Sequence, residues 1–243
     1  MATTLPRKAL ISITSYTGVL FADGENTGLF YIEALHPYEV LTRAGFEVDL
    51  ASETGEYGID ALSTRDQFLV GSDKETFHNP DHPFNVKLKQ LKKASDLRKE
   101  DYGVFFASAG HAALYDYPAA RNLQTIAENI WARGGVLAAT CHGAAIFPGV
   151  IDRATSKPVI DGKVVTGFTK EGEVILKVMD TLRAHKVVMI EDAVKKAGGF
   201  YSAPNEPFDD YSITAGRIVS GANPASARSA AERSVQVFNQ LTA

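Results

Sequence analysis

The chain's single cysteine, Cys141, lies in the stretch AATCHGAAIF and is followed at once by His142. The residues before it are apolar and those after it are small, which predicts a buried strand that passes directly into a helix. A nucleophile on such a turn is held exposed, needs small neighbours and faces amide groups at the helix start. A helix N-terminus also lowers the pKa of a thiol, and the thiolate is the reactive form. We therefore expect Cys141 to be an accessible nucleophile of low pKa rather than a buried small hydrophobe.

Three titratable residues are candidates to assist the thiol, and spacing alone leaves their roles open. His142 is adjacent to Cys141, and adjacent side chains at a helix start point apart, so it need not be the base for the thiol. Glu173 follows a strand-like segment and is a weak candidate to orient His142. Glu33 interrupts an apolar helix face, where a carboxylate is costly unless it has a partner or a function. Near a thiol it would have a raised pKa and could transfer protons, and a solvated glutamate is the equal alternative.

A second loop is expected to reach the same place. Residues 102–107 and 136–140 are apolar runs, typical of parallel strands that are buried on both faces. Gly110 and His111 follow the first run, and Cys141 follows the second. Because ligands bind at the carboxyl ends of parallel strands, these two strand ends are predicted to form one site.

The elements that must position these residues alternate between strands and helices. Further strands are expected over residues 8–14 and 46–51, and helices over 29–43, 119–133, 142–147 and 225–241, with Pro37 kinking or restarting the first helix. Residues 55–100 form a polar insertion with a lysine-rich helix near 85–97. Short antiparallel additions are predicted over 159–165, around an Asp-Gly turn, and over 211–220. This order predicts an α/β fold of one domain, residues 1–243, with a mostly parallel sheet between helices.

Composition excludes several classes of protein. The formal net charge of −4 and the pI near 5.9 give no basic surface for nucleic acid, so no nucleic-acid partner is expected. No run approaches the length of a membrane span, and residues 1–7 lack the apolar segment of a signal peptide. One cysteine can form neither an internal disulfide nor a multi-thiolate zinc site, which suits a reducing, cytoplasmic location. The sequence also lacks a phosphate-binding glycine motif and metal-ligand spacing among its other histidines, so we expect no cofactor and no metal.

Several stretches together resemble the DJ/PfpI superfamily, and within it the fungal small heat-shock-protein branch of glutathione-independent glyoxalase III enzymes. The resemblance extends in order over nearly the whole chain and is specific, because the Cys-His pair, the Ala-Gly-His loop and the Tyr-Ile-Glu-Ala-Leu-His-Pro segment occur together. The stretches that carry it are SYTGVLFADGENTGLFYIEALHPYEVL, GFEVDLASETG, FFASAGHAALYDYP, GGVLAATCHGAAIF, GKVVTGFTKEGE and DDYSITAGRIVSGANPASA.

The resemblance implies a flavodoxin-like sandwich, as in class I glutamine amidotransferases, that usually forms a homodimer. It implies Cys141 as nucleophile, His142 and Glu173 as its triad partners, and Glu33 as the carboxylate that touches the thiol. The implied activity converts methylglyoxal, or another small 2-oxoaldehyde, to D-lactate without glutathione or metal, with a stress-protective role in which chaperone activity can coexist.

The chemistry expected of these groups begins with attack of Cys141 on the aldehyde carbon, which gives a hemithioacetal. Backbone N–H groups at Gly110 and His111 and at the turn would hold its oxyanion. We favour Glu33 for proton transfer near the sulfur and His142, oriented by Glu173, for transfer between the carbons. Two other classes stay open: a cysteine peptidase on the same fold, and a holdase chaperone or redox sensor that uses an accessible thiol.

Overall fold

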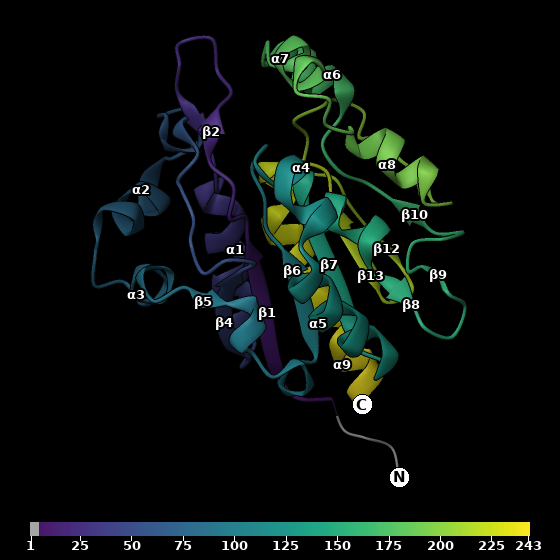
Figure 1. The fold of residues 1–243 in the computed structure, drawn as a ribbon. Coiled ribbons are helices and arrows are strands. Elements are labelled where there is room, and N and C mark those ends of the chain that lie inside the picture. The colour runs from purple at the N-terminus through teal and green to yellow at the C-terminus, as the bar shows by residue number, and fades with distance from the viewer. Residues whose placement is uncertain (1–4) are drawn as a thin grey trace.

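A seven-stranded sheet forms the centre of the computed structural model, which describes residues 5–243 (Figure 1). Every neighbouring pair in it is parallel except β12 and β13, which are antiparallel. The mostly parallel sheet predicted from the sequence is thus confirmed. In spatial order its strands are β12 (Ser212–Ala215), β13 (Ile218–Gly221), β7 (Val136–Thr140), β6 (Val104–Ala107), β1 (Lys8–Ile13), β4 (Glu47–Ser52) and β5 (Lys92–Lys93).

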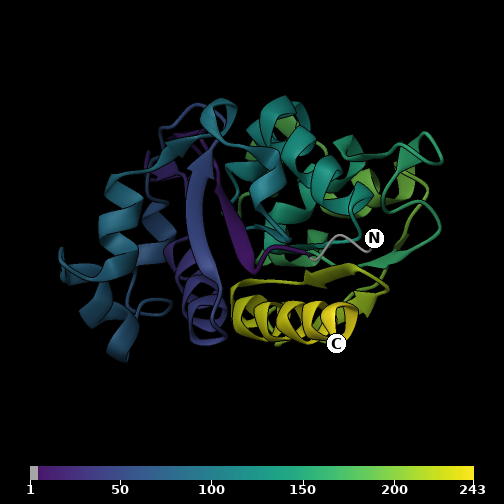
Figure 2. The same ribbon diagram turned by 90° about the horizontal axis from the view of Figure 1, so that it is seen from below.

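Helices cover both faces of this sheet. Along β1, Ala9, Ile11 and Ile13 belong to one apolar core, whereas Leu10 belongs to the other, as the alternation of side chains along a strand requires. Figure 2 shows the yellow C-terminal helix and the first helix below the sheet, and teal helices above it. The helices are α1 (Tyr31–Arg43), α2 (Gly71–His78), α3 (Pro83–Lys89), α4 (Ala113–Asp116), α5 (Arg121–Ala132), α6 (Lys170–Ile175), α7 (Met179–Ala184), α8 (Ile190–Lys196) and α9 (Ala227–Thr242).

The first helix does not restart at Pro37, which was one of the two outcomes expected for it. Pro37 lies inside α1, and the helix nevertheless runs without interruption from Tyr31 to Arg43. Pro37 has no N–H to donate to the carbonyl of Glu33 four residues earlier. Packing of one apolar face against the sheet and of the other against α9 keeps the helix continuous despite that missing bond.

The insertion over residues 55–100 contains more elements than predicted. Instead of one helix near residues 85–97, the chain forms α2 and α3 and then extends into the edge strand β5, which pairs with β4. The helical pattern ends because Phe84 and Leu88 pack into the core while the following lysines reach the sheet edge. The 3-10 helix η1 (Ala61–Thr64) precedes these elements, and η2 (Ala94–Asp96) and η3 (Lys99–Asp101) follow them.

The predicted hairpin over 211–220 is confirmed as β12 and β13, whereas that over 159–165 is wrong. Val164 and Val165 form β10, which pairs in parallel with the distant β11 (Phe200–Tyr201), and Val159 and Ile160 are buried in the core. Local turn residues do not decide such a pairing, because the partner comes from another part of the chain. The remaining short elements are β2 (Gly18–Val19) with β3 (Asn26–Thr27), β8 (Ile151–Asp152) with β9 (Lys157–Pro158), η4 (Tyr117–Ala119), η5 (Cys141–Gly149) and η6 (Pro224–Ser226).

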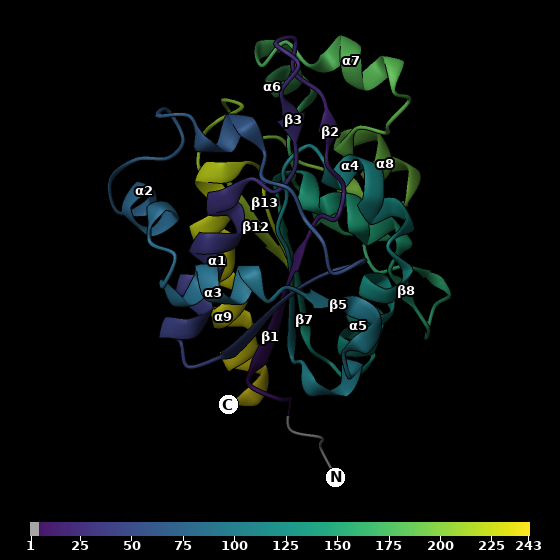
Figure 3. The ribbon, with the colours of Figure 1, turned by 60° about the vertical axis from the view of Figure 1, so that its left-hand side comes forward.

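The carboxyl ends of β1, β6 and β7 meet at one end of the sheet. The β2–β3 hairpin and the α6–α7 segment rise from that end in two different views (Figures 1 and 3). No helix within residues 5–243 has the length and apolar character needed to cross a bilayer. The prediction about an N-terminal signal segment falls partly on residues 1–4, which lie outside the described residues. Because strands from both halves of the chain share one sheet, we propose that the chain forms one domain.

Candidate active site

The turn at Cys141 is the strained strand-to-helix junction that the sequence predicts. Cys141 follows β7 directly and has a φ of 54°, in the left-handed region that residues with a side chain rarely adopt. The neighbouring Gly143 must be small, because a Cβ there would lie 2.3 Å from the carbonyl oxygen of Ala107 on β6. The helix expected over 142–147 follows, in the form of the 3-10 helix η5. The backbone of η5 packs closely on β6, and this close contact requires small residues in η5.

The backbone conformation of Cys141 brings the adjacent His142 into contact with the thiol. His142 Nδ1 lies 3.2 Å from Cys141 Sγ, and His142 Nε2 lies 2.8 Å from Glu173 Oε1. A carboxylate only accepts hydrogen bonds, so Nε2 carries the proton in neutral His142 and Nδ1 is free to accept the thiol proton. The positive φ at Cys141 thus removes the objection that adjacent side chains point apart. The three residues form a connected Cys-His-Glu array.

A second imidazole shares the same carboxylate, and sequence reasoning missed it. His111 Nε2 lies 2.9 Å from Glu173 Oε2, and the two imidazole rings are tilted against each other with centroids 4.4 Å apart. Only the backbone of His111 was expected to contribute. The position of His111 just past a buried strand indicated the site, but the contact with Glu173 depends on how α6 is placed over the sheet.

The pKa values of the two imidazoles are shifted in opposite directions. Burial lowers the pKa of His142. Burial also acts to lower the pKa of His111, but the charge and hydrogen bond of Glu173 outweigh it and raise that pKa. Burial opposes ionisation of Glu173, and the two histidines nevertheless lower its pKa to about 2. These shifts favour an ionised Glu173 beside a neutral His142, which is the form that can accept a proton.

Glu33 is buried beside the thiol. Of the two alternatives that the sequence left open, a buried carboxylate and a solvated one, the structure has the first. Its side chain is fully buried, and burial raises the pKa of Glu33 to about 8, against the lowering effects of Cys141 and His111. Within residues 5–243 neither carboxyl oxygen has a hydrogen-bond partner of normal geometry. A carboxyl group with this pKa is mostly protonated at neutral pH and can both donate and accept a proton.

The expectation of an accessible thiol with a lowered pKa is wrong for this structure. Cys141 is only 2% exposed, and burial together with the charge of Glu33 raises the pKa of the thiol. The favourable field at the start of η5 is too weak to offset the loss of hydration in this closed site. Cys141 is nevertheless part of a pocket wall and contacts His142, so it is not an inert core residue.

The loop after β6 supplies amide groups to the same pocket. Gly110 has a φ of 136°, and a Cβ there would lie 2.1 Å from the carbonyl oxygen of Gly28, so only glycine fits. No hydrogen bond between residues 5 and 243 uses the amide N–H of Gly110 or of His111. These two donors are therefore free for a ligand at the place predicted for oxyanion binding.

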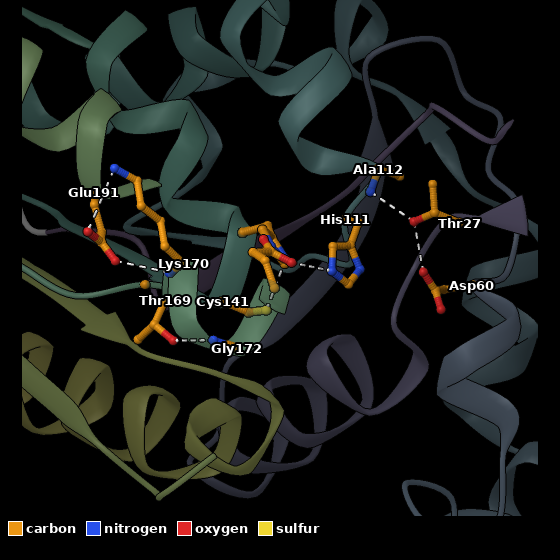
Figure 4. Close-up of polar contacts among 12 residues, drawn as sticks. Thr27, Asp60, His111, Ala112, Cys141, Thr169, Lys170, Gly172 and Glu191 are labelled. Carbon is orange, nitrogen blue, oxygen red and sulfur yellow. Dashed lines mark hydrogen bonds and ion pairs between the residues drawn. The ribbon is translucent and has the colours of Figure 1, made fainter. Parts of the chain in front are cut away.

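Two sets of hydrogen bonds hold these loops in place (Figure 4). The hydroxyl of Thr27 donates to Asp60 at 2.8 Å and accepts from the amide of Ala112 at 3.0 Å, which ties the loop after β6 to the insertion. On the other side, Thr169 caps α6 and Glu191 accepts from the amide of Lys170 at 3.0 Å. The helix that carries Glu173 is thus fixed at its first turn.

The pocket that contains the sulfur, which we call the nucleophile pocket, is small and mostly apolar. It has a volume of about 10 Å³, close to the space of one water molecule. Cys141, His142, Gly110 and His111 supply its polar side. Its apolar side is formed by Phe30, Leu62, Phe68, Phe168, Leu176 and Phe208.

The same residues give the one group within 5–243 that resembles a metal-binding cluster. Ligand atoms of His111, His142 and Glu173 lie within 4.8 Å of one another. Each oxygen of Glu173 already bonds to one imidazole, so the geometry fits a hydrogen-bonded array with no further group. That the protein needs no metal or cofactor stays a prediction.

Comparisons with known proteins show which proteins this chain resembles. The glutathione-independent glyoxalase HSP31 of Saccharomyces cerevisiae is 51% identical over 96% of this chain and 98% of its own length. Glyoxalase 3 of Candida albicans is 48% identical over 95% and 98% of the two chains. No family model matches the chain.

Solved structures show the same relationship. The crystal structure of glyoxalase III from Candida albicans superposes with a TM-score of 0.93 at 48% identity, covering 95% of this chain and 97% of that one. A ThiJ/PfpI domain protein from Brachyspira murdochii superposes with a TM-score of 0.61 at 12% identity over 97% and 98% of the two chains, and so shares the fold alone. The chain therefore belongs to the family of glutathione-independent glyoxalases, on the flavodoxin-like fold of DJ-1/ThiJ/PfpI proteins.

Proposed function

We propose that this protein is a glutathione-independent glyoxalase that converts methylglyoxal, and other small 2-oxoaldehydes, to D-lactate through a hemithioacetal on Cys141. The observation that carries the proposal is the contact of the Cys141 thiol with neutral His142 and buried Glu33 in a closed, apolar pocket. The names of the relatives support the reaction class, and the size of the pocket supports a small substrate.

The first step is addition of the thiol to the aldehyde. As Sγ of Cys141 bonds to the aldehyde carbon, Nδ1 of His142 accepts the thiol proton and the carbonyl oxygen takes up the negative charge. The amide groups of Gly110 and His111 would stabilise that oxyanion, because they have no other hydrogen-bond partner among the described residues. Removal of one such donor costs roughly 2.7–4 kcal/mol in other enzymes. The proton then passes to this oxygen, so the hemithioacetal is a neutral isomer of thiol plus aldehyde.

The second step moves a hydrogen between the two substrate carbons. A base removes the proton from the former aldehyde carbon to give an enediol, and returns a proton to the adjacent carbon to give a thioester. Water then hydrolyses the thioester to lactate and restores the thiol, so the whole reaction adds one water to methylglyoxal without oxidant or reductant.

The contacts support a division of labour that differs from the one favoured from the sequence. His142 Nδ1 lies 3.2 Å from Sγ, and we assign it to the thiol proton. Glu33 has no other hydrogen-bond partner among the described residues, and its pKa of about 8 suits both removal and return of a proton. We therefore assign Glu33 to the transfer between the carbons.

The direct test is an assay of the purified protein after metal removal, with methylglyoxal and without glutathione. D-lactate is measured with a stereospecific dehydrogenase, and Cys141→Ser and Glu33→Gln are the comparison variants. Stoichiometric D-lactate from the parent protein, and none from Cys141→Ser, is expected. Turnover that requires glutathione, or survives Cys141→Ser, would refute the proposal.

The alternatives make different predictions. A peptidase needs an open groove for a polypeptide, and the nucleophile pocket, with its volume of about 10 Å³, has no room for one. A holdase chaperone role should survive Glu33→Gln, because it needs no proton transfer. The stress-protective role and the homodimer remain predictions from the family resemblance, and the cytoplasmic location remains a prediction from cysteine usage.

A further inference from the structure

A second cavity lies directly outside the nucleophile pocket. It has a volume of about 190 Å³, and we call it the outer cavity. Phe68, Phe208 and Pro224 line both cavities and so form the wall between them. Ile32, Gln67 and Asn223 belong to the outer cavity alone. The space next to the sulfur is thus far smaller than the space immediately beyond this wall.

Phe208 is the exposed member of this wall and is held by its neighbours. The fully buried side-chain amide of Asn223 donates to the carbonyl oxygens of Pro207 at 3.0 Å and of Asp209 at 2.6 Å. The backbone on each side of Phe208 is therefore anchored to one residue. The side-chain oxygen of Asn223 accepts a hydrogen bond from the backbone N–H of Ser226 at 3.2 Å, which fixes the orientation of the Asn223 side chain.

The ring of Phe208 is connected by aromatic contacts to the catalytic array. Its centroid lies 6.0 Å from that of Phe168, and the Phe168 ring lies 4.8 Å from the His142 ring. From the insertion, Phe68 packs edge-to-face on Phe30 with centroids 5.2 Å apart. Two aromatic rings from opposite sides thus narrow the approach to the sulfur, and neither carries a group that could take part in the chemistry.

We propose that Phe208, held by Asn223, is a specificity-determining residue that limits the substrate to 2-oxoaldehydes with small substituents. The inference rests on the proposed function and adds the class of substrate that can reach Cys141. With a smaller residue at this position the two cavities merge, and a 2-oxoaldehyde with an aryl substituent can place that substituent in the outer cavity. A three-carbon substrate gains less from the change, because it has no large substituent to place in the outer cavity.

One experiment tests the size filter without reference to turnover. Cys141 is the chain's single cysteine, so alkylation reports on this sulfur alone. The rate with iodoacetamide is compared with the rate with a bulky arylmaleimide in the parent protein, in Phe208→Ala and in Phe208→Trp. Phe200→Ala is the matched control, because Phe200 is 62% exposed and lines neither cavity.

We expect Phe208→Ala to raise the maleimide-to-iodoacetamide rate ratio by about tenfold or more, which is the usual size of a steric discrimination in an apolar pocket. Phe208→Trp should lower the ratio and Phe200→Ala should leave it unchanged. An unchanged ratio in both Phe208 variants would overturn the proposal. Phe208 is 37% exposed, so neither substitution removes a core side chain.

A second experiment measures kcat/KM for methylglyoxal and for phenylglyoxal. Phe208→Ala should raise the phenylglyoxal-to-methylglyoxal ratio by about tenfold or more, with most of the change in phenylglyoxal. Equal ratios in parent and variant would overturn the role in substrate choice. If the parent protein does not turn over methylglyoxal, the proposed function fails, and the alkylation ratio still decides whether Phe208 limits access.

Discussion

Glu173→Gln tests the electrostatic design of the site, because it keeps the shape of the side chain and removes its charge. Glu173 accepts one hydrogen bond from each imidazole, at 2.8 and 2.9 Å. An amide has one acceptor oxygen and one donor nitrogen, so it can accept from one imidazole only. The other imidazole must move its proton to Nδ1 or lose its partner. When His142 is that imidazole, its Nδ1 can no longer accept the thiol proton.

The expected losses follow from the same two bonds. A comparable substitution, which leaves a catalytic histidine in the wrong tautomer, lowers kcat by about 10⁴ in a serine protease, and we expect a loss between about 10² and 10⁴ here. The pKa of Glu173 is lowered from 4.5 to about 2, which corresponds to about 3 kcal/mol of folding free energy. This contribution is present above pH 4.5 and is lost as the pH falls towards 2, because the folded protein holds the ionised form.

The assay combines kcat/KM for methylglyoxal at pH 7 with denaturant unfolding at pH 7 and at pH 3. Glu171→Gln is the matched control, because Glu171 lies on the same short helix and is exposed. Glu173→Gln should be less stable than the parent at pH 7, and the difference should shrink at pH 3. Full activity in Glu173→Gln, or a stability difference that grows at low pH, would refute the reasoning.

Three further substitutions test separate parts of the site. Glu33→Gln should become more stable than the parent as the pH rises from 4.5 to 8, by on the order of 3–5 kcal/mol, because the raised pKa of Glu33 makes its ionisation costly; a pH-independent difference in unfolding free energy would contradict this. Gly143→Ala should lower stability by about 1–3 kcal/mol and reduce Cys141 alkylation, since the added Cβ meets the carbonyl of Ala107, and a thermal scan that matches the parent would be evidence against the tight turn. Thr27→Val should lower kcat with little change in global unfolding, whereas Thr27→Ser restores the hydroxyl and should restore kcat; equal kcat in both variants would show that the link from Asp60 to Ala112 is not needed.

The sequence was sufficient for the parts of the site that depend on local pattern. Uniform apolar runs identified β6 and β7, and small residues around Cys141 identified the turn. The contact between Cys141 and His142 was left open because it depends on the left-handed φ of Cys141, which composition does not reveal. The spacing of residues also gave no sign that the side chain of His111 would contact Glu173.

The errors share one physical cause, which is dependence on distant parts of the chain. Val164 and Val165 pair with residues near 200, so a local Asp-Gly turn misled the assignment. The thiol was expected to have a low pKa from its place at a helix start, but desolvation by surrounding elements has the opposite and larger effect. In the proposed mechanism the thiol therefore depends on His142 to accept its proton during attack, rather than on a field that ionises it in advance.

The central claim is that Cys141 bonds to the substrate and that Glu33 moves the carbon-bound proton. Glu33→Gln is incubated with methylglyoxal and without glutathione at neutral pH, quenched, and mapped by peptide mass spectrometry. The account predicts that one methylglyoxal accumulates on the Cys141 peptide while D-lactate formation stops. Adducts confined to lysine and arginine side chains, together with continued D-lactate formation, would contradict it.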